Sequence, residues 1–93
     1  MVNVCDEDLL GRRLSEGELT VDISPEYFSG EVLSLEEAVS LVQEAAIANL
    51  VGEAIVGEVL RRGLAHPAAV RRIAGVPFLM IFKFTSGSYS VRP

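Results

Sequence analysis

The apolar segment at residues 45–57, AAIANLVGEAIVG, constrains the fold of this chain most strongly. A helix that is apolar on nearly every side must be buried on nearly every side. The segment also contains Asn49 and two glycines, Gly52 and Gly57. A glycine in a helix interior costs about 0.5–1 kcal/mol relative to alanine. We therefore predict that these three residues serve packing or an interface, because another backbone approaches them closely.

Two interpretations of this segment are open. In the first, one long helix spans residues 35–62, and its small residues form a flat strip where another backbone packs. In the second, Asn49 caps a new helix and the chain bends there. We favour the continuous helix, because the apolar residues after Asn49 stay in phase with a helical period. A functional interpretation is that a buried asparagine fixes the pairing register of an oligomer.

The start of this helix has the clearest local signal in the chain. Ser34 can accept a hydrogen bond from the backbone N–H of Glu37, and the Glu37 carboxylate can reach back to the N–H of Ser34. This reciprocal arrangement is a capping box. Arg61 and Arg62 suit the last turn of the helix, and Gly63 suits the position that follows it.

Short elements are expected before and after this helix. An alternating pattern predicts a strand at residues 18–23, and a shorter strand begins near Val2. A proline at the first helical position predicts short helices at residues 25–30 and 67–73.

The end of the chain has the composition of a buried strand. Residues 78–84, FLMIFKF, are apolar on both faces, and a turn at 85–88 and a short pairing strand at 89–91 follow them. We predict one α+β domain over residues 1–93. In this fold a small sheet packs on the long buried central helix, with short extra helices around it.

The composition favours association. Hydrophobic residues make up 49% of the 93 residues, and the mean hydropathy is +0.36. A chain of this size buries only a modest share of its surface, so we expect part of the apolar surface to face a second copy or another protein. Asn49 and Glu53 interrupt the longest apolar run, which falls short of the ~20 residues of a membrane span. The acidic N-terminus does not resemble a signal peptide, so we expect a cytoplasmic protein without a membrane partner.

The net charge of −5 conceals a strong asymmetry. Residues 1–58 contain all 13 acidic residues and two arginines, a charge of −11, whereas residues 59–93 contain six basic residues and no acidic one, a charge of +6. Such asymmetry suggests an anionic partner. The simpler alternative is that the two halves neutralise each other across the fold or across a dimer.

Four arginines could make the basic half an anion-binding site. Only eight residues, 63–70, separate the pair Arg61 and Arg62 from the pair Arg71 and Arg72. Guanidinium groups gathered in one place would bind RNA phosphates or an acidic peptide. RNA contact by these four residues is therefore a prediction, although no base-reading motif accompanies them.

Enzymatic chemistry has little support in the residues. Cys5 and His66 are the only cysteine and histidine, which is too few for a zinc site, and His66 is better suited to capping a helix before Pro67. The consecutive acids Asp6, Glu7 and Asp8 could hold a hard cation, but neighbouring carboxylates point in different directions. We predict no catalytic residue, no metal and no cofactor.

Five segments of the sequence resemble a small archaeal family known as domain of unknown function 424. They are VCDEDLLG (4–11), EGELTVDIS (16–24), YFSGE (27–31), AIANLVGE (46–53) and the segment from GL to VRRIAGVP (63–77). The resemblance implies an archaeal cytoplasmic origin and one compact α+β domain. It supplies no activity, cofactor or catalytic residue, so no site can be carried over.

The chain departs from this family at both ends. Family members have a further strand before the VCDEDLLG region, and a histidine where this chain has Phe78. We predict that residues 78–84 and their pairing strand occupy the position of that first strand, in one sheet with residues 18–23. The function predicted from these features is a non-enzymatic, self-associating interaction module. The alternative is an RNA- or ribonucleoprotein-associated protein that uses the basic half.

Overall fold

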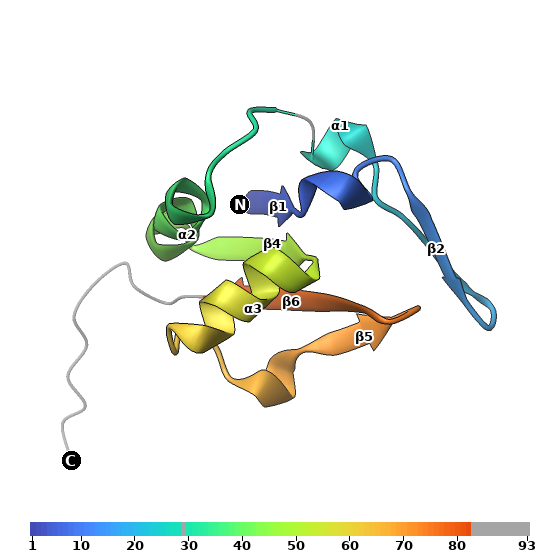
Figure 1. The fold of residues 1–93 in the computed structure, drawn as a ribbon. Helices are drawn as coiled ribbons and strands as arrows, with labels where there is room; N and C mark the ends of the chain where they lie inside the picture. Colours follow the sequence, from blue (N-terminus) through green and yellow to red (C-terminus); the bar gives the residue numbers. More distant parts are fainter. Residues whose placement is uncertain (29, 83–93) are drawn as a thin grey trace, which may run out of the picture.

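The computed structural model describes residues 1–28 and 30–82, which form a four-stranded sheet, a two-stranded hairpin and short helices (Figure 1). The strands are β1 (Val2–Cys5), β2 (Arg13–Glu16), β3 (Leu19–Asp22), β4 (Ile47–Val51), β5 (Arg71–Ile73) and β6 (Val76–Phe82). The helices are α1 (Pro25–Phe28), α2 (Leu35–Glu44) and α3 (Glu53–Arg61), and two 3-10 turns occupy Glu7–Leu9 and Pro67–Ala69. The predicted α+β class is therefore confirmed.

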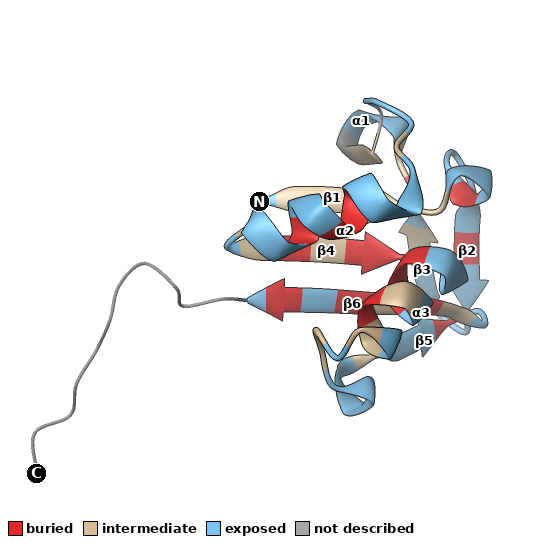
Figure 2. Cartoon of the chain, turned by 60° about the vertical axis from the view of Figure 1, so that its left-hand side comes forward, coloured by how far each residue is buried: buried red, intermediate tan, exposed pale blue. Residues whose placement is uncertain are grey.

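The main sheet has the strand order β1-β4-β6-β5. Strand β1 runs parallel to β4, whereas β6 runs antiparallel to both β4 and β5. Helices α2 and α3 lie on the same face of this sheet (Figures 1 and 2). We call it the helix-covered face and the opposite side the second face.

The larger core lies between the two helices and the helix-covered face. Each helix buries one apolar stripe, as expected for amphipathic helices against a sheet. Alternate residues of β4 and β6 point toward these stripes, because side chains alternate across a strand. The most deeply buried members, each at most 2% exposed, are Val39, Val42, Ala48, Leu50, Ile55, Val56, Val59 and Leu79.

A smaller core covers one half of the second face. Its buried members Leu9, Leu14 and Ile23 come from the first 3-10 turn and from the hairpin region, and they pack with Val51 of β4. The half-buried side chains of Cys5, Phe28, Val76 and Phe78 complete this cluster. The other half of the second face lacks such a cover among the described residues.

The predicted continuous helix over residues 35–62 is wrong. The chain forms α2, then strand β4, then α3, so the AIANLV segment is a central strand. The alternative in which Asn49 caps a second helix is also wrong, because Asn49 lies inside β4 and Gly52 is the residue that precedes α3. A short apolar run fits a buried helix and a buried strand equally well. Pairing with β1 and β6 decides between them, and the local sequence does not show that pairing.

The predicted helix at residues 67–73 is correct only in its first part. His66 caps the 3-10 turn through its Nδ1, which accepts from the N–H of Ala68 at 3.0 Å. The chain then becomes strand β5, which pairs with β6 across the two-residue turn Ala74-Gly75. Both turn residues have positive φ, 52° and 80°, as a tight type I′ hairpin requires. The β5–β6 hairpin therefore takes the place of the second half of the expected helix.

The predicted strands differ from the observed ones mainly in pairing. Strand β3 confirms the strand at 18–23, and β6 largely matches the strand at 78–84, whose last two residues lie outside the described residues. These two strands lie in different sheets, so the prediction that they share one sheet is wrong. Strand β2, which pairs with β3, was not predicted. The predicted turn and strand at 85–91 also lie outside the described residues.

Candidate functional site

The carboxylate of Asp6 joins the end of β1 to the start of α3. It accepts hydrogen bonds from the N–H groups of Ala54 at 2.8 Å and Ile55 at 3.0 Å. The N–H of Asp6 in turn donates to the carbonyl of Val51 at 2.9 Å. A negative side chain here satisfies two unpaired helix donors and faces the positive end of the helix dipole. Asp6 therefore acts as a long-range helix cap.

Gly52 is the residue that precedes α3, and it lies against the Asp6 side chain. Its φ is +122°, a conformation that residues with a side chain rarely adopt, and a Cβ at this position would lie 2.3 Å from Cγ of Asp6. The close neighbour of Gly52 in the folded chain is thus Asp6. Gly57 differs, because nothing lies within 4 Å of a Cβ placed there, and it lines a hollow of about 310 Å³ beside Leu60 and Arg72. An interface at Gly57 stays a prediction.

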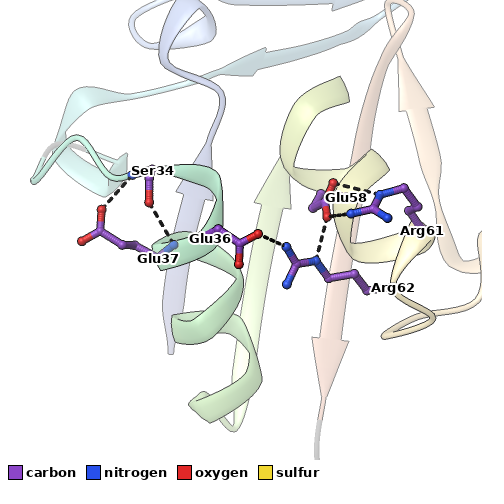
Figure 3. Close-up of polar contacts among 6 residues, drawn as sticks. All are labelled: Ser34, Glu36, Glu37, Glu58, Arg61 and Arg62. Carbon is purple, nitrogen blue, oxygen red and sulfur yellow. Dashed lines mark hydrogen bonds and ion pairs between the residues drawn. The ribbon is translucent and has the colours of Figure 1, made fainter.

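Arg61 and Arg62 end α3 as predicted, and both are ion-paired with Glu58 (Figure 3). Arg62 also reaches Glu36 of α2, with 2.5 Å between its Nη2 and Oε1 of Glu36. Hydrogen bonds from Arg61 and Arg62 lower the pKa of Glu58 from 4.5 to about 2. Gly63 follows the helix with a φ of 71° and completes its C-terminal cap. Both arginines therefore form ion pairs within α3, and Arg62 also links α3 to α2.

Arg71 and Arg72 lie on β5, away from this helix end. Arg72 pairs with Glu53 at 2.6 Å and donates to the carbonyl of Gly75 at 3.0 Å. Glu53 is the first residue of α3, so Arg72 and Arg61 mark opposite ends of a nine-residue helix that is about 13 Å long. Arg71 is exposed and has no ion pair among the described residues. The structure thus does not bring the four arginines together: Arg61 and Arg62 meet at Glu58, whereas Arg71 and Arg72 point to opposite faces of the sheet.

The uncovered half of the second face carries apolar and amide side chains. Met80 is 49% exposed and Phe82 is 57% exposed, while Asn3, Ile47 and Asn49 are half-buried. The register places Asn3 beside Asn49 and Asn49 beside Met80, so these three side chains form one row across β1, β4 and β6. We call these five residues the open sheet face. It contains no charged side chain.

The sequence did not reveal this surface. The strand at 78–84 was predicted to be buried on both faces, which is wrong for Met80 and Phe82. Asn49 was singled out, but as part of a helix. The usable signal was the polar Asn49 inside a run of strand-forming residues, since a polar residue on a central strand marks a face that is not fully buried.

The remaining candidates do not assemble into a reactive site. Burial raises the pKa of the Cys5 thiol, and the nearby charges of Asp6 and Asp8 raise it further, so the thiolate that would act as a nucleophile is disfavoured. Among residues 1–28 and 30–82, no three acidic, cysteine or histidine side chains are grouped as metal ligands would be.

No helix in the described part of the chain is long and apolar enough to cross a bilayer.

Comparisons with known proteins agree with the resemblance inferred from the sequence. The chain resembles the crystal structure of an uncharacterized conserved protein from the archaeon Methanopyrus kandleri, with a TM-score of 0.78 and 26% identity over 97% of this chain and 86% of that chain. None of the curated proteins is significantly similar in sequence. A family model described as a protein of unknown function, DUF424, matches residues 1–84. The protein therefore belongs to the DUF424 family.

Proposed function

We propose that this protein is a non-enzymatic module that binds a second copy of itself through the open sheet face. The observation that carries the proposal is the exposure of Met80 and Phe82 on strand β6 beside half-buried Ile47. Apolar side chains gathered on one exposed face commonly mark an interaction surface. Covering them removes apolar area from water, which favours association.

The chemistry of this face favours a second copy over a different partner. The chain has a net charge of −5, so two copies repel each other, and a contact between them is least unfavourable when the touching surfaces carry no charged side chains. The open sheet face meets that condition. Its two amides, Asn3 and Asn49, each carry both donors and acceptors, so they can pair with their own counterparts across a two-fold axis. Asn49 would then fix the register of the dimer, as a buried polar residue can.

Sedimentation equilibrium of the purified protein tests this proposal. We expect a dimer for the native chain and a monomer for the double variant Met80→Lys/Phe82→Lys, because two cations per copy cannot be buried against each other. The matched control is Leu19→Lys/Val32→Lys, which adds the same charge at exposed apolar residues elsewhere and should leave the dimer intact. A native chain that stays monomeric at high micromolar concentration refutes the proposal.

An isosteric variant tests the role assigned to Asn49. Asn49→Asp keeps the shape of the side chain but places two carboxylates near the two-fold axis at neutral pH. We expect the dimer to dissociate at pH 7 and to re-form near pH 3, where the carboxyl groups are protonated. An Asn49→Asp variant that dimerises like the native chain at pH 7 removes Asn49 from the interface.

RNA binding through the basic residues is a second proposal, and exposed Arg71 carries it because this arginine has no ion pair within the described residues. The other three arginines would have to exchange carboxylate partners for phosphates. Binding of labelled bulk RNA across a salt series tests it. We expect affinity to fall steeply with salt and to weaken in the Arg71→Ala/Arg72→Ala variant. No binding at low salt rejects this proposal and leaves self-association untouched.

A further inference from the structure

A large groove lies along the outer edge of β1. Its volume is about 1140 Å³, and it is lined by β1, the first 3-10 turn, α2 and the segment before α2, with Phe28 of α1 and with Ala54 and Ile55 of α3 at its ends. Several apolar side chains at its wall are exposed: Val32 is 76% exposed, Leu35 is 41% exposed and Leu41 is 40% exposed. This volume slightly exceeds the range of about 300–1000 Å³ that is usual for small-molecule pockets. The groove also follows all four residues of β1, so it can hold an extended chain segment.

The floor of this groove is an unpaired strand edge. Strand β1 ends the sheet order, and no further strand pairs with it in the described part of the chain. The N–H of Asp6 points toward β4, since it donates to Val51. Backbone groups alternate in direction along a strand, so Asn3 and Cys5 direct their N–H and C=O groups to the outer edge. These groups match the hydrogen-bonding pattern of an added strand.

The charge of the groove selects the partner. Its lining contains four acidic residues, Asp6, Glu7, Asp8 and Glu31, and no lysine, arginine or histidine. Asp6 is occupied by the cap of α3, which leaves three carboxylates at the rim. A ligand that satisfies this surface has cationic side chains, apolar side chains and a free backbone edge.

We infer that the β1 groove binds an extended basic peptide segment of a partner protein, which adds as a strand to β1. The lysine or arginine side chains of the peptide face Glu7, Asp8 and Glu31, and its apolar side chains cover Leu35 and Leu41. A second copy of this chain fits less well, because edge-to-edge pairing of two β1 strands would bring both sets of carboxylates together. The groove and the open sheet face share only Asn3. The backbone of Asn3 lies on the outer edge of β1 in the groove, and its side chain lies on the open sheet face.

Fluorescence anisotropy with a labelled peptide tests the inference. The probe is a peptide of about eight residues in which valine alternates with lysine, a length that exceeds the ~13 Å span of β1 at about 3.3 Å per residue. Three exposed ion pairs together correspond to roughly a tenfold change in affinity. We therefore expect the triple variant Glu7→Gln/Asp8→Asn/Glu31→Gln to bind about tenfold more weakly than the native chain.

Matched controls separate strand addition from general attraction between opposite charges. The triple variant Glu18→Gln/Glu26→Gln/Glu44→Gln removes the same charge at exposed residues outside the groove and should bind like the native chain. A probe with N-methyl groups on alternate amides keeps its charge but cannot add to a strand, and it should lose binding. The amide signals of Asn3 and Cys5 should shift in an NMR titration with the unmethylated probe.

Several results would overturn the inference. They are equal weakening in both triple variants, unchanged binding of the N-methylated probe, or no binding of the unmethylated probe at low salt. If the rim carboxylates only protect the edge from aggregation, the groove variant aggregates and still binds the probe as the native chain does. The Met80→Lys/Phe82→Lys variant should keep full probe affinity, which distinguishes failure of this inference from failure of the proposed dimer.

Discussion

Replacing Gly52 by alanine should destabilise the protein through two linked effects. The backbone φ of +122° and ψ of 155° belong to a region that is almost restricted to glycine, and occupying it with alanine costs about 1–3 kcal/mol. The added Cβ would also lie 2.3 Å from Cγ of Asp6, so the carboxylate must move away from α3. Loss of a helix N-cap costs about 0.5–2 kcal/mol. We therefore expect Gly52→Ala to lower the free energy of unfolding by about 1.5–5 kcal/mol in total.

A double-mutant cycle separates these two effects. Asp6→Ala alone removes the hydrogen bonds to Ala54 and Ile55 and should cost about 1–2 kcal/mol. Because the cap can be lost only once, the double variant should be less destabilised than the sum of the single variants by about 1–2 kcal/mol. Urea unfolding followed by circular dichroism measures all four free energies, and Asp8→Ala serves as a control that should change stability by less than about 0.5 kcal/mol.

Two results would refute this reasoning. One is a Gly52→Ala variant as stable as the native chain, which would mean that the junction between β4 and α3 tolerates a side chain. The other is strict additivity in the cycle, which would mean that Gly52 and Asp6 do not share one structural role.

Three further predictions concern the helices. Ser34→Ala should lower the free energy of unfolding by about 1 kcal/mol, because the capping box of α2 is formed in the structure, whereas Ser40→Ala on the exposed side of α2 should be nearly neutral in urea unfolding. Glu58→Gln should make the free energy of unfolding fall less steeply as the pH is lowered. The arginine partners of Glu58 lower its pKa from 4.5 to about 2, so its stabilising contribution is present above pH 4.5 and is lost as the pH falls toward 2. Urea midpoints at several pH values check this, and parallel curves for both proteins would contradict it. Gly57→Ala should raise stability by about 0.5–1 kcal/mol in urea unfolding, because α3 leaves open space there, and a loss of stability would show that the space is needed within the fold.

The candidate surfaces were only partly predictable. The charge asymmetry left two alternatives open, and the pairs of Arg62 with Glu36 and of Arg72 with Glu53 agree with the one in which the acidic and basic halves meet within the fold. The other alternative, an anionic partner, stays a prediction. The open sheet face was not foreseen, because its residues come from β1, β4 and β6, which are distant in sequence. The groove along β1 was not foreseen either, since a strand edge is free only when the strand order is known.

The sequence by itself determined the features that rest on neighbouring residues. These include the capping box at Ser34, the end of α3 shortly before Gly63, the cap by His66 and the position of strand β3. In each case the chemistry acts over a few residues, so the local sequence holds all of the information. The tertiary structure alone decided whether the AIANLV segment became a helix or a strand. That choice depended on pairing with β1 and β6, and on the Asp6 carboxylate, 48 residues from Ala54, which starts the next helix where the strand ends.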